Sequence, residues 1–184
     1  MPNSQNGWPV LQYGDPKVYT WVIPAKTGAF TLRIRNGSAG FLIAYFVLWY
    51  AEKIEPIKGK ILDDWGHAVR PIGDSKWISN HASATAVDLN ALDHPQGKRG
   101  TFNFLVDYKK KRITAYARIM MRLKFAMQGT LRWGENYSTT VDGMHFEINV
   151  GLSAAEDRAR KLMGTSRGRR ILEANPTQKA VILS

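Results

Sequence analysis

Cysteine is absent from this chain of 184 residues. Disulfide bonds and metal sites with thiolate ligands are therefore excluded. Any metal ion that the protein binds must be held by histidine, aspartate or glutamate side chains. Hydrophobic residues make up 44% of the chain and aromatic residues 11%, which is typical of a globular protein, and the length suits one domain.

Long hydrophobic runs are also missing. The longest apolar run covers residues 39–51, which is too short to span a bilayer and indicates a buried helix. The first ten residues, MPNSQNGWPV, lack the basic start and apolar centre of a secretory signal. We therefore expect synthesis in the cytoplasm and no membrane insertion.

Acidic residues are few. The chain has 26 lysines and arginines against 15 aspartates and glutamates, which gives a net charge of +11. A field of this sign favours polyanions. Nucleic acid and an anionic cell envelope are both candidates, and charge alone does not separate them.

The most informative stretch that is present is SNHASATAVDLN, residues 79–90. From Thr85 onwards polar and apolar positions alternate, which predicts a strand with Asp88 on its polar face. His81 is expected in the loop that leads into this strand. An apolar back and a polar front suit a strand that packs on a core and presents a carboxylate to a cleft.

A second stretch, DGMHFEIN at residues 142–149, shows the same alternation and puts His145 and Glu147 on its polar face. Two such strands side by side would bring His81, Asp88 and His145 to one point. Two imidazoles and one carboxylate form a three-ligand zinc site with an open fourth position, which is the catalytic pattern. Asp142 lies at the turn into the second strand, within reach of a water molecule at the ion, where it would act as general base.

Together these motifs resemble the zinc peptidases of the D-alanyl-D-alanine carboxypeptidase and L-alanyl-D-glutamate endopeptidase family, whose pattern is S-x-H-x-x-G-x-A-x-D followed by [DE]-x-x-H. The resemblance is closest to peptidase domains of bacteriophage endolysins that attack actinobacterial walls. It runs from about residue 6 to residue 149 and includes several shorter stretches: NGWPVL at 6–11, DDWG at 63–66, RP at 70–71, HP at 94–95, GTF at 100–102, RWG at 132–134 and MHFE at 144–147.

This resemblance implies further roles. Arg70 takes the place of a basic residue near the metal, where it would bind a substrate carboxylate or stabilise the developing oxyanion. Ser79, Glu147 and Trp133 are expected behind the ligands or beside the substrate. Because Glu147 shares a strand face with His145, it would either orient a ligand histidine or pair with a basic residue at the surface. Ala84 replaces the glycine of the first motif, so a backbone position that favours glycine must tolerate a methyl group.

The fold class that we predict is α+β: a small central antiparallel sheet carries the zinc site and packs against helices, with a helical C-terminal tail. Strands are expected at residues 18–23, 30–34 and 130–133. Helices are expected at 39–54 with Ser38 as N-cap, at 113–127, at 153–163 with Ser153 in a capping box, and at 169–174. Residues 1–150, with an N-terminal arm and hairpin at 1–35, would form the zinc peptidase domain, and 151–184 a basic helical extension of it.

Several other polar residues are assigned no chemistry. Asp63 and Asp64 are interpreted as a solvated turn or helix start, since adjacent side chains rarely point the same way. His94 is given a structural or rim role, and His67 is interpreted as a solvated loop residue. The basic run at 109–112 is interpreted as a solvated face beside a helix.

The function that the sequence predicts is hydrolysis of an amide bond in peptidoglycan stem peptides or crossbridges by a zinc enzyme, with Zn²⁺ as the cofactor. The endolysin resemblance implies synthesis in the host cytoplasm and action on the host wall after release. The expected partners are peptidoglycan and anionic wall polymers, with no nucleic acid and a monomeric state. Residues 151–184 would be either a segment that adheres to the anionic wall or a solvated C-terminal appendage. The alternative is a non-catalytic wall-binding or polyanion-binding protein on the same fold.

Overall fold

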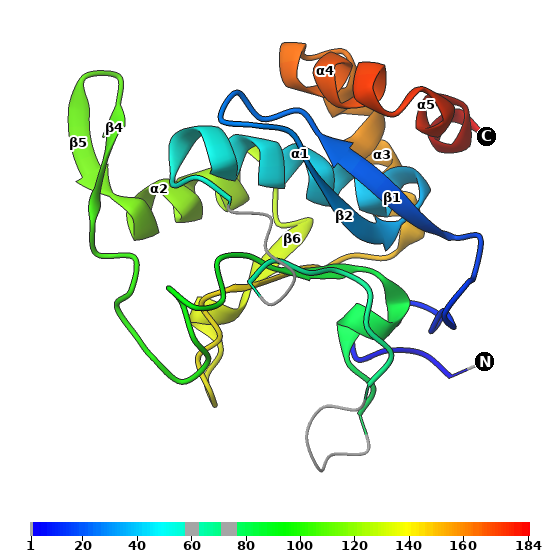
Figure 1. Ribbon diagram of the computed structural model, residues 1–184, viewed down its shortest axis with the longest axis horizontal. Coiled ribbons are helices and arrows are strands. Elements are labelled where there is room, and N and C mark those ends of the chain that lie inside the picture. Colours follow the sequence, from blue (N-terminus) through cyan, green and yellow to red (C-terminus); the bar gives the residue numbers. More distant parts are fainter. Residues whose placement is uncertain (1, 58–62, 71–76) are drawn as a thin grey trace.

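A long helix, α1, lies at the centre of the computed structural model, which describes residues 2–57, 63–70 and 77–184 (Figure 1). Helix α1 spans Gly37–Lys53, and every residue from Gly37 to Ala51 is buried. The predicted buried helix is therefore confirmed, and a helix that is apolar all round must be covered on several sides. Its predicted N-cap is wrong, because the cap is Asn36 and its side chain makes no capping hydrogen bond.

One cover is an antiparallel hairpin, and both of its predicted strands are confirmed. Strand β1 spans Val18–Ile23 and strand β2 spans Phe30–Arg35, with Val18 paired to Arg35 and Ile23 to Phe30. The side chains of Trp21, Ile23, Leu32 and Ile34 are buried and belong to the core that surrounds α1.

A second cover is a three-stranded antiparallel sheet with the order β3-β7-β6. Its strands are short: Ala86–Asp88 (β3), His145–Ile148 (β7) and Leu131–Trp133 (β6). Phe146 of β7 faces the core, where its ring lies 4.7 Å from that of Phe46 on α1. The opposite face of the same strand carries His145 and Glu147, so the sheet separates α1 from the polar side chains.

Residues 105–126 differ from the prediction of one helix at 113–127. They form a hairpin of β4 (Leu105–Tyr108) and β5 (Lys111–Thr114), then helix α2 (Ala115–Met121), which continues as a π-helix at Arg122–Ala126. Thr114 caps α2 by accepting a hydrogen bond from the backbone N–H of Ala117. In the helical part and its C-cap the buried positions recur every four residues: Ala115, Ile119, Leu123 and Met127.

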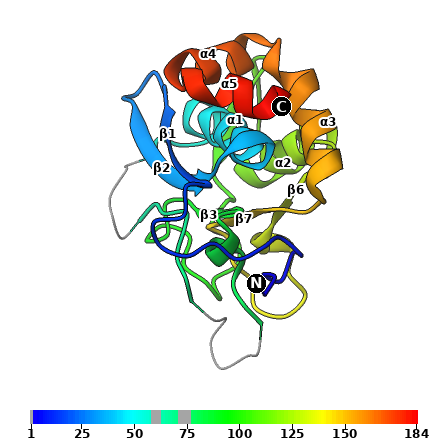
Figure 2. The same ribbon diagram turned by 90° about the vertical axis from the view of Figure 1, so that its right-hand side faces the viewer.

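The C-terminal segment forms three helices that pack against α1 and one another (Figure 2). They are α3 (Leu152–Met163), α4 (Ser166–Ala174) and α5 (Pro176–Leu183). The capping box at Ser153 is wrong, because the N-cap of α3 is Gly151. Pro176 begins α5, where the sequence predicted no further helix.

These three helices are tied to the rest of the protein by two buried amides. The Asn175 side chain accepts from the backbone N–H of Val22 and donates to its carbonyl, at 2.8 Å each. The Gln178 side chain accepts from the N–H of Gly37, the first residue of α1. The fold class is thus confirmed as α+β, with small antiparallel sheets and a helical C-terminal segment. No helix within the described residues is long and apolar enough to cross a membrane.

Candidate metal centre

The two predicted motifs meet on adjacent strands. Strand β3 pairs with β7 so that Asp88 lies directly opposite His145. His81 comes from a 3-10 helix at Asn80–Ser83, where a simple loop had been predicted. Ser79 caps this short helix, because its hydroxyl accepts a hydrogen bond from the backbone N–H of His81.

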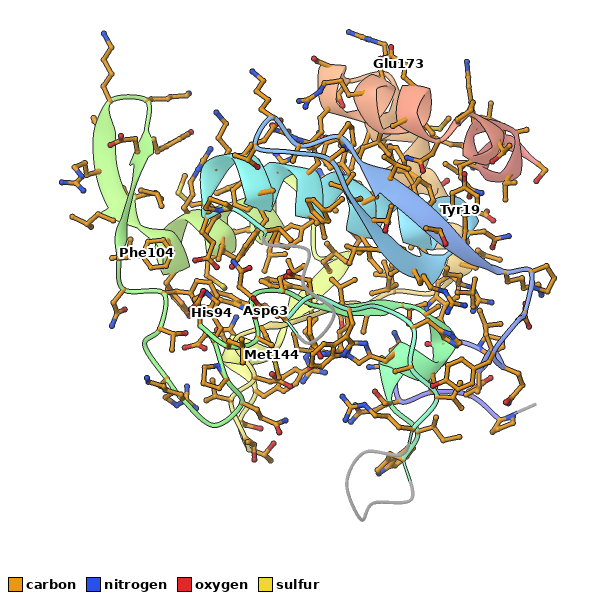
Figure 3. The ribbon with its side chains drawn as sticks, in the orientation of Figure 1. Tyr19, Asp63, His94, Phe104, Met144 and Glu173 are labelled. Carbon is orange, nitrogen blue, oxygen red and sulfur yellow. The ribbon has the colours of Figure 1, made fainter. Side chains whose placement is uncertain are left out.

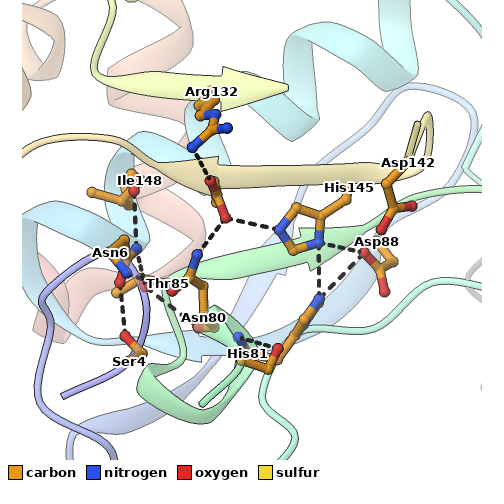
Figure 4. Close-up of polar contacts among 12 residues, drawn as sticks. Ser4, Asn6, Asn80, His81, Thr85, Asp88, Arg132, Asp142, His145 and Ile148 are labelled. Atoms are coloured by element: carbon orange, nitrogen blue, oxygen red, sulfur yellow. Dashed lines mark hydrogen bonds and ion pairs between the residues drawn. The ribbon is translucent and has the colours of Figure 1, made fainter. Parts of the chain in front are cut away.

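The three side chains converge on one point (Figure 4). His145 Nδ1 lies 2.9 Å from Asp88 Oδ1, and His81 Nε2 lies 3.2 Å from the same oxygen. The two ring nitrogens are 3.1 Å apart. All three residues are buried, with at most 8% of any one exposed.

The far side of each imidazole is held by an acceptor. His81 Nδ1 donates to the carbonyl of Gly66 at 2.6 Å, and His145 Nε2 donates to Glu147 Oε2 at 3.0 Å. With a metal ion bound, these two donations would leave the lone pair of each ring facing the ion, which is the tautomer that a metal ligand needs.

Glu147 in turn has its own partners. Its Oε2 accepts a hydrogen bond from the side-chain amide of Asn80, and Arg132 Nη1 lies 3.7 Å from its Oε1. Burial alone would raise the pKa of Glu147, but the hydrogen bond from His145 and the contacts with Asn80 and Tyr137 lower it below its ordinary value. Glu147 is therefore an anion that orients the His145 ring.

The buried carboxylate of Asp88 and the imidazoles of His81 and His145 stabilise opposite charges on one another. Burial lowers the pKa of His145, but hydrogen bonds to Asp88 and Glu147 outweigh burial and raise it to about 10. Burial raises the pKa of Asp88, and the neighbouring His81 and His145 hold it well below its ordinary value. A buried carboxylate between two imidazoles thus favours a positive charge at their meeting point.

A zinc ion fits this donor set. Ligand bonds of about 2.0–2.1 Å in a tetrahedron separate the donor atoms by about 3.3 Å. The observed separations of 2.9–3.2 Å need to widen by only a few tenths of an ångström. Two imidazoles, one carboxylate and ordered acceptors behind the rings form the pattern of a catalytic zinc site with one free position.

Comparison with known proteins agrees with this geometry. Residues 73–148 match the model of a family described as D-alanyl-D-alanine carboxypeptidase. The match covers less than half of the chain but contains both motifs, and it suggests a metal-dependent peptidase that acts on peptidoglycan-type substrates. No curated protein and no solved structure matches the chain.

A cleft of about 380 Å³ opens over the three central residues. Asp142 and Arg70 line this cleft, as do Ser79 and Gln96. Asp142 is half-buried; its Oδ2 accepts a hydrogen bond from the Gln96 amide at 3.2 Å, while its Oδ1 is buried without a partner. Burial raises the pKa of Asp142 above its ordinary value.

The turn that carries Asp142 is fixed by its neighbours. The Asp142 carbonyl accepts from the N–H of His145, and the Asp142 N–H donates to the carbonyl of Gly134. A side chain at Gly134 would place its Cβ 2.3 Å from the Asp142 carbonyl oxygen, so only glycine permits this approach. This requirement explains the glycine in the RWG stretch.

Two predicted site residues lie at the margins of the centre. Arg70 is exposed at the rim of the cleft. Trp133 does not line the cleft: its ring stacks on that of Phe146 at 5.5 Å, and its Nε1 donates to the carbonyl of Gly143 at 2.7 Å. Trp133 therefore supports the Asp142–His145 turn from the core side. Pro71, which belonged to the same resemblance, lies outside the described residues.

Sequence reasoning missed Asn80, Gly66 and Tyr137 as neighbours of the centre. Tyr137 lines the cleft, and burial together with the charge of Glu147 raises the pKa of its hydroxyl. Asn80 stood inside the first motif, next to His81, so its position was a usable signal. Gly66 contributes a backbone carbonyl, and no side-chain pattern reveals that.

Three assignments outside the centre are corrected. Asp63 and Asp64 are buried and not solvated; they accept hydrogen bonds from the backbone N–H groups of Leu92 and Asn90. His67 is half-buried, with its Nε2 3.0 Å from the carbonyl of Leu11, and so is not a free loop residue.

His94 has the structural role that the sequence predicted. It is buried, stacks on Phe102 at 3.7 Å and contacts Glu55 Oε1 at 2.6 Å. Figure 3 shows His94 and Asp63 among the loops below α1.

Proposed function

We propose that this protein is a zinc peptidase that hydrolyses an amide bond in the stem peptides or crossbridges of peptidoglycan. The observation that carries the proposal is the convergence of His81, Asp88 and His145, with each imidazole held from behind by an acceptor. The family match over residues 73–148 supports it independently.

The three central residues would hold the ion, which when bound supplies Lewis-acid polarisation of the scissile carbonyl and lowers the pKa of a water molecule. Asp142 would accept a proton from the attacking water and pass it to the leaving amine. Its unpaired, buried Oδ1 leaves one oxygen free for that exchange. The raised pKa of Asp142 favours return of the proton.

Arg70 would act on the substrate from the rim. Its exposed guanidinium is available to bind a carboxylate of the stem peptide or to stabilise negative charge on the carbonyl oxygen. Glu147 and Asn80 would position His145, and Trp133 would support the turn that bears Asp142.

The wider setting is also a proposal. The motif resemblance supports a bacteriophage endolysin that is made in the host cytoplasm and acts on the host wall after release. Within it, residues 1–150 would carry the peptidase and 151–184 a basic extension of the same domain. The protein would act as a monomer and bind anionic wall polymers.

The decisive experiment combines metal analysis with product analysis. Purified protein should contain about one zinc per chain, and it should release new amino termini from actinobacterial peptidoglycan. Mass spectrometry of the fragments identifies the bond that is cut, and a chelator followed by added zinc should abolish and restore release. Zinc-loaded protein that binds walls but releases no peptide would instead establish the non-catalytic alternative.

A further inference from the structure

A row of arginines and aromatic rings lies away from the metal centre, on helices α1 and α4, on α2 and its π-helical continuation, and on strand β4. The guanidinium carbon of Arg118 lies 3.8 Å from the ring centre of Tyr108 and 5.6 Å from that of Trp49. Arg122 lies 5.2 Å from Trp49 and 5.1 Å from Tyr45, and Arg167 lies 5.5 Å from Tyr45. The rings thus link three guanidiniums in the order Arg118, Arg122, Arg167, which we call the arginine row.

The row carries positive charge that the chain does not neutralise. Glu52 pairs with Arg167, at 3.7 Å, and with Arg170, at 2.8 Å. Within the described part of the chain, no carboxylate pairs with Arg118 or Arg122. Of the three arginines in the row, only Arg167 has a carboxylate partner, and it shares that partner with Arg170. Like charges at close range are unfavourable without a counter-ion.

Hydrogen-bond donors in the row are also left over. The Nε atoms of Arg118, Arg122 and Arg167 are buried without an acceptor, as is Nη2 of Arg122. Burial, together with the neighbouring charges of Arg167 and Arg118, lowers the pKa of Arg122. Burying charged guanidiniums whose N–H groups lack acceptors costs free energy, and stacking on aromatic rings offsets part of this cost. A ring is still a poor substitute for an oxygen acceptor at a buried N–H.

We propose that the arginine row is a binding site for the phosphodiester groups of a linear, flexible polyol-phosphate polymer of the cell envelope. Guanidiniums match phosphate oxygens in a fork geometry, and a row of them suits an anion that repeats along a chain. Each of the three residues is half-buried, so part of each side chain is open to solvent. The site does not depend on the metal centre, because the sheet face that bears His145 points away from α1.

Nucleic acid is the less favoured partner. Proteins that bind single strands stack bases on exposed aromatic faces. Trp49 and Tyr45 are only 2% and 4% exposed, with guanidiniums over their rings, so they offer no such faces. A polymer without bases needs only the charged groups.

The test is titration of the zinc-loaded full chain with a defined glycerol-phosphate oligomer, measured by calorimetry at low and high salt. Arg118→Gln combined with Arg122→Gln and Arg167→Gln should weaken binding by at least about tenfold, because charge-assisted hydrogen bonds are lost. The matched control is Lys17→Gln with Lys26→Gln and Arg33→Gln, three exposed residues on or beside the β1–β2 hairpin, which removes the same charge elsewhere. Equal weakening in both triple variants would overturn the proposal.

Two further arms sharpen the result. The described structure shows no hydrogen bond for the Arg118 side chain, so the single variant Arg118→Gln should fold. This variant should still bind the oligomer several-fold more weakly than wild type. Unchanged binding by the folded variant counts against the site. Single-stranded DNA with the same number of phosphates should bind more weakly than the oligomer. Tighter binding of DNA would overturn the assignment to an envelope polymer.

Discussion

Asp142 is the residue on which the proposed chemistry depends most directly. Replacing it with asparagine keeps the size of the side chain but removes the proton acceptor, so hydrolysis of peptidoglycan should fall by about 10²–10⁴-fold. The three ligands are untouched, so zinc content measured by elemental analysis should stay at the wild-type value.

The control for this variant is Gln96→Ala, which removes the hydrogen bond to Asp142 Oδ2 while leaving the carboxylate in place. It should lose much less activity than Asp142→Asn. Near-normal hydrolysis by the asparagine variant would show that another group takes the proton.

Ala84 offers a second test at the scale of one residue. Its φ is +57°, in the left-handed region, and its side chain is fully buried. Alanine tolerates this conformation at a cost of about 1–2 kcal/mol, whereas a β-branched residue does so poorly. Urea denaturation should therefore give Ala84→Gly a free energy of unfolding within about 1 kcal/mol of the wild-type value. The free energy of unfolding of Ala84→Val should be at least about 2 kcal/mol below the wild-type value. A valine variant as stable as wild type would contradict this view of the loop.

The ligand residues were predictable because the chemistry selects their types. A metal site in a chain without cysteine must use histidine or carboxylate ligands. The alternation of polar and apolar residues put Asp88 and His145 on polar strand faces, and His81 just before the first strand. The groups behind them were harder to predict. The carbonyl of Gly66 is available on any residue, so only the folded backbone reveals that it holds the His81 ring.

At the scale of the element, strand β7 supplies both His145, a proposed ligand, and Glu147, the carboxylate behind its ring. Glu147→Gln should keep the size of the side chain but weaken the hydrogen bond to His145 Nε2. Zinc affinity, measured by competition with a chromogenic chelator, should fall about 10–100-fold.

Arg132→Gln is the matched control for that variant. It removes a largely exposed partner 3.7 Å from Glu147 Oε1, and exposed ion pairs contribute about 0–1 kcal/mol. Its zinc affinity should therefore change by less than about threefold. Equal losses of zinc affinity in the two variants would mean that the affinity depends on the whole set of contacts around Glu147 and not on the Glu147–His145 hydrogen bond in particular.

Helix α5 also acts on a distant element, since Gln178 accepts a hydrogen bond from the first N–H of α1. Gln178→Ala leaves that buried donor without a partner, so thermal or urea unfolding should show a loss of about 1–2 kcal/mol. Lys179→Ala, at the exposed neighbouring position, should change stability by less than about 0.5 kcal/mol. A loss no larger than that of the control would show that water replaces the Gln178 side chain.

Elements with a strong compositional signal were predicted well: α1 from its long apolar run, and the β1–β2 hairpin from two short stretches rich in β-formers. The β4–β5 hairpin was missed because its turn consists of Lys109 and Lys110, with φ values of +47° and +65°. Such a turn normally carries asparagine or glycine, and lysines give no signal for it. Helix α5 was not predicted, although it begins at Pro176 and proline is well suited to the first turn of a helix.

At the scale of the whole molecule, the C-terminal helices are part of the core, not a solvated appendage. Five large apolar side chains of this segment are buried: Leu162, Met163, Ile171, Leu172 and Ile182. At about 2 kcal/mol each they contribute roughly 10 kcal/mol, which equals the total stability of many domains. Removing residues 151–184 should therefore unfold the protein and expose α1, so a wall-binding assay on such a truncation would report on unfolding and not on adhesion.

Calorimetry of the truncated chain should show no cooperative transition, whereas the full chain should unfold cooperatively. The adhesive role of the segment is better tested with Arg160→Gln and Lys161→Gln, which remove exposed charge and leave the buried face of α3 intact. That pair should unfold like wild type, so any change in its wall binding at low salt can be assigned to charge. A truncated chain that keeps a sharp transition would instead show that residues 2–150 fold alone, and the contacts of Asn175 and Gln178 with the hairpin and α1 would then be dispensable.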